Sequence, residues 1–429
     1  MFSWYVELSR TERRTFWSCF GGWALDAMDV QLFSFLLPAL VLAFGMTPGQ
    51  SGLLGTSALV ASALGGWAAG LLADRYGRVR VMQVAILWYA TFTLLSGFTQ
   101  SFDQLLIMRS LQGLGFGGEW AAGAVLMGEI IRPQHRGKAV GCVQSAFAVG
   151  WFAAALVSTV LLAVLPADWA WRAVFCIGVL PALLVIFIRR NVREPEVFVA
   201  ARRIAAASGQ RPSPLAIFSP ALLRTTVLAS LLALGVQGSS YAIITWLPTF
   251  LRTVRHLSAT GAGSYVMVVT FGAFCGYITS AYLTDAVGRR RNFLIYAVGC
   301  WIVDAVYMYA PVGNDAILLL GFPFGFFTQG IYASLGPYFT ELFPTPVRAS
   351  GQSFAYNFGR SIGAFFVTIV SLLAQVMPLG QAIGLLSLGG YALTIAAALL
   401  LPETRGIELA ATMPDAERPA SLGAARIEP

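Results

Sequence analysis

The feature that most constrains this chain is a series of long apolar stretches that recurs along nearly its whole length. A transmembrane helix needs about 20 consecutive, mostly apolar residues. Twelve stretches meet that requirement, so the sequence predicts an all-α integral membrane protein with twelve transmembrane helices. The predicted spans are residues 16–44, 52–73, 79–99, 104–129, 139–165, 171–189, 226–251, 262–284, 292–312, 315–340, 350–375 and 379–401.

Composition excludes a water-soluble fold for these 429 residues. Hydrophobic residues make up 57% of the sequence and charged residues only 11%, whereas soluble domains carry about 25% charge. The 28 basic and 20 acidic residues are too few for a water-facing surface. Soluble enzymes, disulfide scaffolds and nucleic-acid binders are therefore excluded, despite the net charge of +8. The five cysteines lie singly, without metal-site or redox spacing, so we expect no metal.

One long polar linker divides the chain. Residues 190–224 contain four prolines and separate the sixth span from the seventh. The sequence therefore predicts an N-terminal six-helix bundle over residues 1–189 and a C-terminal bundle over residues 225–401. Residues 402–429 are expected to form a cytoplasmic tail.

The basic residues predict the orientation of the chain. Arg172, Arg252 and Arg255 are expected on the outside, while Arg109 and Arg360 lie within spans. The other 23 of the 28 basic residues fall on the side of the two termini and the linker. Cytoplasmic loops carry such an excess of Lys and Arg. We therefore expect a multi-pass protein of the plasma (bacterial inner) membrane with both termini cytoplasmic, whose positive charge faces anionic lipid.

Two pairs of polar motifs repeat at an almost constant offset. The segment Gly70-Leu-Leu-Ala-Asp74-Arg75-Tyr-Gly77-Arg78 has its counterpart in Ala281-Tyr-Leu-Thr-Asp285-Ala-Val-Gly288-Arg289, 211 residues later (285 − 74). Glu129 and Arg136 are matched by Glu341 and Arg348, 212 residues later (341 − 129). Two pairs at one offset predict duplicated six-helix halves, related as parallel repeats about the membrane normal.

These motifs resemble the signature of the major facilitator superfamily. The pattern Gly-x-x-x-Asp-Arg-x-Gly-Arg joins two spans, and Arg109-x-x-Gln112-Gly113-x-Gly115 is similar to the second motif of that superfamily. The resemblance implies that the motif residues form a gate, which latches the halves together in the outward-open state and releases them when the protein opens inward. The implied gating residues are Gly70, Asp74, Arg75, Gly77, Arg78, Glu129, Arg136, Asp285, Gly288, Arg289, Glu341 and Arg348.

Ionisable residues within spans indicate function, because a charge near the bilayer centre is costly. Asp26 lies near mid-membrane, and Asp29 shares its helix face at i+3. A carboxyl in an apolar interior favours the protonated form, as a proton carrier requires, so we expect Asp26, Asp29 or both to couple transport to H⁺. A fixed salt bridge to Arg109 is the alternative. Glu119 could either receive a proton or pair with a basic residue.

A polar stripe on the eleventh span predicts the substrate site. It consists of Ser353, Asn357, Arg360 and Ser361. A buried guanidinium stays charged and can bind a carboxylate with two parallel hydrogen bonds, so Arg360 is the expected anchor for an anionic substrate; pairing with Asp304 or another acid is the alternative. The other expected substrate-binding residues are Arg109, Gln112, Gln237, Tyr241, Gln329, Tyr332 and Asn357.

Asp304 has no assigned role. The ninth helix is usually peripheral in the superfamily, so this side chain should either turn inward or stay protonated.

Two further segments indicate which branch of the superfamily this chain resembles. Asp26-Ala-Met-Asp29 and Gly117-Gly118-Glu119-Trp120-Ala-Ala-Gly123 look like the sialate and monocarboxylate proton symporters. This resemblance implies symport of a small organic anion with H⁺, no other cofactor and a monomer. Efflux or drug/proton antiport on the same scaffold is the alternative. Neutral solutes and a nutrient sensor are further alternatives.

Overall fold

The computed structural model describes residues 3–207, 213, 215–257 and 259–409, in which every regular element is a helix. All twelve predicted spans coincide with helical segments, which confirms the all-α fold. By length and apolar composition, ten stretches of the described chain could cross a membrane. The helices α2 (Arg10–Phe44) and α5 (Phe102–Ile130), which carry Asp26, Asp29, Arg109 and Glu119, run beside these stretches.

The first half of the chain forms six spans, of which the sixth is interrupted. Gly178 and Val179 separate two short helices there, and Pro181 follows at the start of the second. The remaining elements of this half are α1 (Ser3–Glu7), α3 (Pro48–Tyr76), α4 (Arg78–Ser96), η1 (Pro133–His135), α6 (Arg136–Val164), α7 (Ala167–Ile177) and α8 (Leu180–Asn191).

The second half repeats the six-span arrangement after a linker that includes α9 (Glu196–Ala207) and η2 (Ala216–Phe218). Residues 208–212 and 214 of the predicted linker and 410–429 of the predicted tail lie outside the described residues. The elements of this half are α10 (Pro220–Thr253), α11 (Ala259–Val287), α12 (Arg289–Tyr309), α13 (Asn314–Gly330), η3 (Ile331–Ser334), α14 (Leu335–Leu342), η4 (Thr345–Val347), α15 (Arg348–Gly363), α16 (Phe365–Leu373) and α17 (Leu379–Leu400).

Proline explains the break in the tenth span. Pro337 has no N–H group, so it cannot donate to the carbonyl of Ala333, and its ring disfavours an α-helical turn before it. The chain passes through the 3-10 turn η3 at this point. The turn carries Tyr332, one of the residues expected at the substrate site.

Glycines permit the abrupt reversals that position the gate. Gly77 is the one residue between α3 and α4, with φ of 114°, and Gly288 holds the same place between α11 and α12, with φ of 103°. A side chain would disfavour these backbone conformations, whereas glycine adopts them readily. Each motif aspartate therefore lies beside the start of the next helix.

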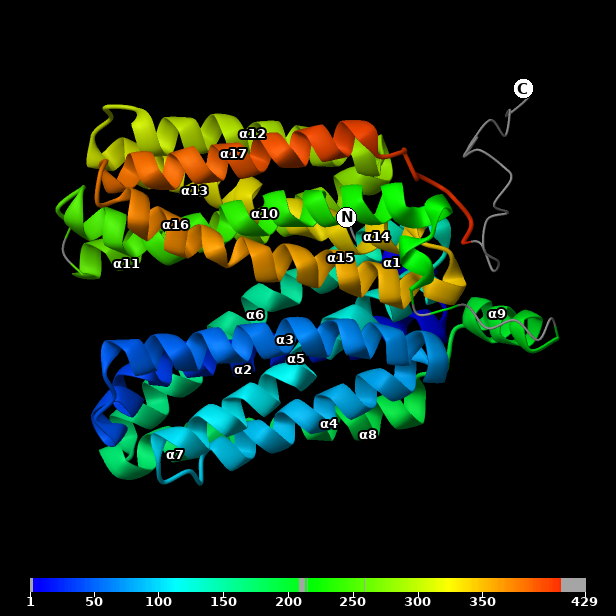
Figure 1. Ribbon diagram of the computed structural model, residues 1–429, viewed down its shortest axis with the longest axis horizontal. Helices are drawn as coiled ribbons and strands as arrows, with labels where there is room; N and C mark the ends of the chain where they lie inside the picture. The colour runs from blue at the N-terminus through cyan, green and yellow to red at the C-terminus, as the bar shows by residue number, and fades with distance from the viewer. Residues whose placement is uncertain (1–2, 208–212, 214, 258, 410–429) are drawn as a thin grey trace.

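The two halves lie side by side with their helices running roughly along the long axis of the molecule (Figure 1). Within the halves, α3 packs against α5 and α11 packs against α13; between the halves, α3 packs against α15 and α6 against α11. The helix α9 stands at one end of the bundle (Figure 1). We call this the latch end, because the repeated motifs lie there, and the opposite end the far end.

The apolar core differs between the two ends. The largest cluster of buried side chains joins both halves, since it contains Trp120 and Val140 from the first and Leu335 and Tyr356 from the second. Two other clusters lie in single halves: one includes Leu36 and other first-half residues, and the other includes second-half residues only. The halves therefore share a core toward the latch end and have separate cores toward the far end.

Candidate functional site

A buried arginine marks the centre of the interface between the halves. The Cζ atom of Arg360 on α15 lies 4.6 Å from the ring centroid of Phe116 on α5 and 5.9 Å from that of Tyr356. Its Nη1 is 3.4 Å from Ser62 Oγ, and its Nε has no hydrogen-bond partner among the described residues. In the same residues Arg360 forms no ion pair, so the alternative pairing with Asp304 is not formed. The guanidinium therefore keeps donors for a ligand.

Two stacked aromatic rings, one from each half, lie next to this arginine. The rings of Trp120 on α5 and Tyr356 on α15 are 3.6 Å apart between centroids and inclined by 23°. Trp120 Nε1 donates to Gln144 Oε1 at 3.2 Å, and Gln237 Nε2 donates to the carbonyl of Tyr356 at 2.8 Å. The stack is therefore fixed from both halves. Both rings are buried, and Tyr356 lies on the latch side of Arg360 because α15 begins at Arg348, at the latch end.

The predicted substrate residues of the second half gather around Arg360. Tyr241 lies within hydrogen-bonding range of the guanidinium, and Tyr332 lies close to Tyr241. Gln329 Oε1 accepts from Tyr277 at 3.1 Å. These side chains come from α10, η3, α13 and α11, of which α10 packs directly against α15.

Asn357 lies one turn along α15 toward the latch end. Its Nδ2 donates to the carbonyl of Ser353 at 2.9 Å, and its Oδ1 has no hydrogen-bond partner in the described chain. The side chain packs against Gly66 of α3, where a Cβ atom would overlap it. This position of Asn357 therefore depends on close approach of the two halves.

Arg109 and Gln112, also predicted to contact substrate, lie with Asp29 inside the first half. Gln112 Nε2 donates to Asp29 Oδ2, and Arg109 Nη1 lies 3.9 Å from the same oxygen. The Arg109 guanidinium also covers the ring of Phe33 at 4.6 Å. This is the geometry of the salt bridge to Arg109, which the sequence left open as the alternative to proton coupling through Asp29. Whether Arg109 and Gln112 also contact substrate stays a prediction.

Asp26 and Glu119 form a second acidic group of the first half. Asp26 is fully buried, and neither of its oxygens has a hydrogen-bond partner among the described residues. Glu119 is also buried, and its Oε2 is equally unpartnered in that part of the chain. Asp26 lies within electrostatic range of Glu119, Asp29 and Arg360. Two ionised carboxylates so placed would repel each other in a medium of low dielectric, so the pair favours at least one bound proton.

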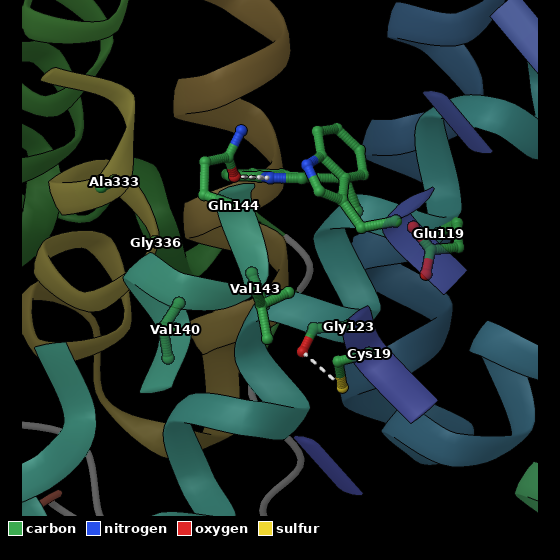
Figure 2. Close-up of a pocket in the computed structure, with 11 residues that line it drawn as sticks. Cys19, Glu119, Gly123, Val140, Val143, Gln144, Ala333 and Gly336 are labelled. Carbon is green, nitrogen blue, oxygen red and sulfur yellow. Dashed lines mark hydrogen bonds between the residues drawn. The ribbon is translucent and has the colours of Figure 1, made fainter. Parts of the chain in front are cut away.

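Glu119 lines a small cavity (Figure 2), which lies toward the latch end because its wall includes Val140, near the start of α6. The cavity measures about 10 Å³, which is roughly the room that one water molecule needs. Cys19 Sγ lies 3.4 Å from the carbonyl of Gly123 at its edge. Ala333 and Gly336 of the second half form part of the wall. Separation of the halves would therefore open this cavity.

The first latch cluster joins α3, α4 and α5 to α15. Glu129 accepts from Arg78 through Nε at 3.0 Å and Nη2 at 3.1 Å, and from Arg348 of the other half at 2.6 Å. Asp74 pairs with Arg78 at 3.1 Å. Asp74 also accepts three hydrogen bonds across the interface, from N of Ala349 (3.1 Å), N of Ser350 (2.7 Å) and Oγ of Ser350 (2.6 Å).

The second latch cluster repeats this arrangement. Glu341 accepts from Arg289 at 2.8 Å and from Arg136 of the other half at 2.9 Å. Asp285 pairs with Arg289 at 2.9 Å and accepts from the backbone N–H groups of residues 137 and 138, at 2.9 and 2.8 Å. The charged residues predicted for the gate, apart from Arg75, thus form two equivalent ionic clusters that tie the halves together.

One glycine of the motif list, Gly70, allows this contact, and one arginine, Arg75, does not take part in it. A Cβ atom on Gly70 would lie 2.6 Å from the carbonyl oxygen of Ala349, so glycine lets α3 approach α15. Arg75 is exposed, and its Cζ lies 5.3 Å over the ring of Tyr76. Arg75 therefore forms no ion pair with Asp74 among the described residues, because Arg78 at i+4 faces the aspartate and the adjacent residue does not.

Two capping glutamates were missed by the sequence analysis. Glu194 accepts from the N–H groups of Arg78 and Val79 at 2.8 and 3.0 Å, at the start of α4. Glu403 accepts from the N–H of Arg289 at 2.8 Å, at the start of α12. Carboxylates stabilise helix N-termini in this way. Their separation of 209 residues (403 − 194) is close to the motif offset, and it could have revealed them.

Comparison with known proteins decides the family. The family model described as Major Facilitator Superfamily matches residues 19–368. The chain is 48% identical to the "Probable 4-methylmuconolactone transporter" of Cupriavidus pinatubonensis over 95% of each chain. It is 28% identical to the "Cis,cis-muconate transport protein" of Acinetobacter baylyi over 88% of this chain and 90% of that protein. The solved proton:xylose symporter XylE matches with a TM-score of 0.75 and 18% identity, over 93% of this chain and 97% of that one.

The chain belongs to the major facilitator superfamily. The resemblance inferred from the motifs is therefore confirmed, as is the twelve-helix fold. This superfamily protein is a multi-pass membrane transporter and not an enzyme.

The aromatic residues of this major facilitator protein's central site carried little sequence signal. Trp120 lies in the segment that resembles the symporter branch, but aromatic side chains are common on membrane helices and do not by themselves mark a site. Tyr356 lies four residues before Arg360, so helical periodicity places it on the same face. Phe116 had no signal, since its contact with Arg360 depends on the packing of one half against the other.

Proposed function

We propose that this protein is a secondary transporter that carries a small organic anion together with H⁺ across the bacterial inner membrane by alternating access. The observation that carries the proposal is the separation of two kinds of group. A guanidinium with free donors lies in the second half, at the interface, whereas Asp26 and Glu119, with their unpartnered carboxylate oxygens, lie in the first half. Substrate and proton would thus bind at neighbouring but different places.

The substrate class follows from Arg360 and its surroundings. A carboxylate matches the fork of the guanidinium, and the rings of Phe116 and Tyr356 offer apolar faces beside it. The names of the two relatives refer to 4-methylmuconolactone and cis,cis-muconate, which are both small unsaturated organic acids. These names and the positively charged site support the same class for this chain. Drug/proton antiport, the runner-up, is disfavoured because Arg360 would repel a cationic drug.

Asp26 and Glu119 support a proton path in the first half. Asp26 lacks any polar partner among the described residues, and this suits a site that binds and releases a proton. Glu119 lies beside the cavity of Figure 2, so it can accept the proton on the latch side. Because Ala333 and Gly336 close that cavity from the other half, release of the proton would require the halves to part.

The packing supports an outward-facing conformation. The ionic clusters and the shared core join the halves at the latch end, while the cores are separate toward the far end. Gly52 and Gly55, near the far end of α3, have no neighbouring atoms around their Cβ positions. We propose that the latch end is cytoplasmic, in line with the excess of basic residues there, and that the protein acts as a monomer.

Uptake by proteoliposomes tests the proposal. Vesicles with purified protein should accumulate labelled 4-methylmuconolactone or cis,cis-muconate when the outside is more acidic than the inside. Vesicles without a pH gradient should only equilibrate, and protein-free vesicles give the background. Uptake of neutral sugars but of neither acid would contradict the proposed substrate class.

A further inference from the structure

A buried carboxyl of the second half lies outside the proposed substrate and proton path. Asp304 on α12 is fully buried, and its Oδ1 has no hydrogen-bond partner in the described residues. Its Oδ2 contacts the hydroxyl of Ser387 on α17. No described Lys, Arg or His forms an ion pair with it. An ionised carboxylate with one neutral partner is strongly disfavoured in such surroundings.

The hydrogen bonds available to Ser387 also favour a protonated Asp304. Besides Asp304, the Ser387 hydroxyl has the carbonyls of Ile383 and Gly384 within reach, at 2.8 and 3.2 Å. A hydroxyl carries one hydrogen but can also accept. If Asp304 is ionised, Ser387 must choose between the carboxylate and the carbonyl of Ile383. If Asp304 is protonated, it donates to Ser387, which donates to Ile383, and both contacts are satisfied.

The neighbouring groups are compatible with a neutral acid. The titratable side chains close to Asp304 are Cys300 and Tyr309 on α12 and Tyr391 on α17. The hydroxyl of Tyr391 is buried and also lacks a hydrogen-bond partner among the described residues. It lies within electrostatic range of both Asp304 and Tyr332 of the substrate site.

The same serine connects Asp304 to the substrate site. Ser239 Oγ on α10 donates to the backbone carbonyl of Ser387 at 2.8 Å. The neighbouring residues on α10 include Gln237 and Tyr241, which contact Tyr356 and Arg360. A chain of contacts thus runs from α12 through α17 to the helix that borders the proposed substrate site, and it remains inside one half.

We propose that Asp304 is a proton-binding site that stays occupied during transport and that positions α10 through Ser387 and Ser239. Asp304 is then a positioning residue, and its proton is not one of those carried with the substrate. The effect on transport rests on the proposed function, whereas the protonation of Asp304 does not.

Infrared spectroscopy of the purified full-length protein tests the protonation. The difference spectrum of wild type minus Asp304→Asn at neutral pH should contain the C=O stretching band of a protonated carboxylic acid. Ser387→Ala should shift that band, because the acid loses its acceptor. Asp315→Asn, which alters an exposed acid of α13, is the matched control and should give no such band. Absence of the band in the Asp304 difference would overturn the proposal.

Uptake of 4-methylmuconolactone tests the positioning role. Asp304→Asn should keep pH-driven uptake within about twofold of wild type, because the amide can also donate to Ser387. Asp304→Ala should raise KM about tenfold, since it removes the hydrogen bond and leaves a buried gap. If Asp304→Ala fails to fold, Ser239→Ala should raise KM in the same direction. Loss of the infrared band on addition of 4-methylmuconolactone, with loss of uptake in Asp304→Asn, would show a transported proton and overturn the proposal. If wild type transports none of the acids, the proposed function fails, and the infrared result still decides the state of Asp304.

Discussion

Substitution of Asp74 by Asn should shift this transporter from its outward-facing to its inward-facing conformation. Both carboxylate oxygens of Asp74 accept hydrogen bonds from the other half, at Ala349 and at Ser350. An amide has one accepting oxygen, and its NH₂ group would face a donor. At least one bond across the interface is therefore lost, together with the charge that pairs with Arg78.

The size of the shift can be derived from these contacts. A hydrogen bond to a charged group contributes about 1.5–3 kcal/mol. Loss of one such bond and weakening of the others gives a decrease in latch stability of about 2–3 kcal/mol. The equilibrium between the conformations should change by roughly 30- to 150-fold. Asp285→Asn, the equivalent change in the second cluster, should act in the same direction.

Spin-label distances across the far end measure this shift. Labels at Gln100 and Thr253, both exposed and in different halves, should move closer together in Asp74→Asn. Glu12→Gln is the control, because Glu12 bonds only Ser9 and Arg132 of its own half among the described residues. Binding of 4-methylmuconolactone should persist in Asp74→Asn while net transport falls. Unchanged distances, or binding that falls in step with transport, would refute the division between gate and site.

Further predictions concern the orientation of the chain in the membrane, the role of Arg360 as substrate anchor and the pH dependence of stability. Leu215→Cys, in the exposed part of the linker, should resist an impermeant thiol reagent in intact cells, and rapid labelling would reverse the orientation. Arg360→Lys should lose both uptake and counterflow, because an ammonium cannot bind a carboxylate with two parallel bonds; full activity would show that only charge matters. Burial raises the pKa of Glu194 and outweighs the backbone hydrogen bonds at the start of α4, which act to lower it. Ionisation therefore costs stability in the folded state, and the contribution of Glu194 is present below the ordinary value near 4.3 and is lost as pH rises through the raised value. For Glu12, burial acts to raise the pKa, but hydrogen bonds from Ser9 and Arg132 outweigh it and lower the pKa, so its contribution is lost as pH falls through the lowered value. Melting temperatures of Glu194→Gln and Glu12→Gln should therefore diverge from wild type in opposite senses across mildly acidic pH, and parallel curves would contradict both.

The sequence predicted the fold and the latch well because both depend on local patterns. Apolar length determines the spans, and the duplicated motifs revealed Asp74 and Asp285 together with their partners. The central site was only partly predictable. Arg360 is rare enough within a membrane span to stand out, but its contact with Phe116 joins two helices far apart in the sequence.

Residues whose role depends on neighbours were the hardest to interpret. Arg109 and Gln112 lie on the face expected for substrate, yet Asp29 occupies them in this conformation. Asp304 turns inward toward Ser387, and an inward position was one of the two expectations for this side chain. Only the structure identifies Ser387 as its partner. Glu194 and Glu403 accept hydrogen bonds from backbone N–H groups. A sequence motif consists of side chains, so it gives no direct signal for such contacts.

We propose that one proton accompanies one organic monoanion, with Asp26 as the proton site, Glu119 on the proton path and Arg360 as the anchor. The loaded complex would then carry no net charge beyond that of the empty protein. A net charge would respond to potential by ~2.3 kcal/mol per 100 mV, whereas a pH difference supplies ~1.4 kcal/mol per unit.

The decisive measurement is uptake of labelled 4-methylmuconolactone into proteoliposomes under an imposed pH difference or an imposed potential. Symport of one H⁺ with one monoanion should give accumulation driven by a pH difference and almost none driven by potential at equal pH. Asp26→Asn, alone or with Asp29→Asn, should abolish accumulation and retain counterflow, because a permanently neutral site can still shuttle loaded substrate. Accumulation driven by potential alone, or full pH-driven accumulation in the double variant, would contradict the account.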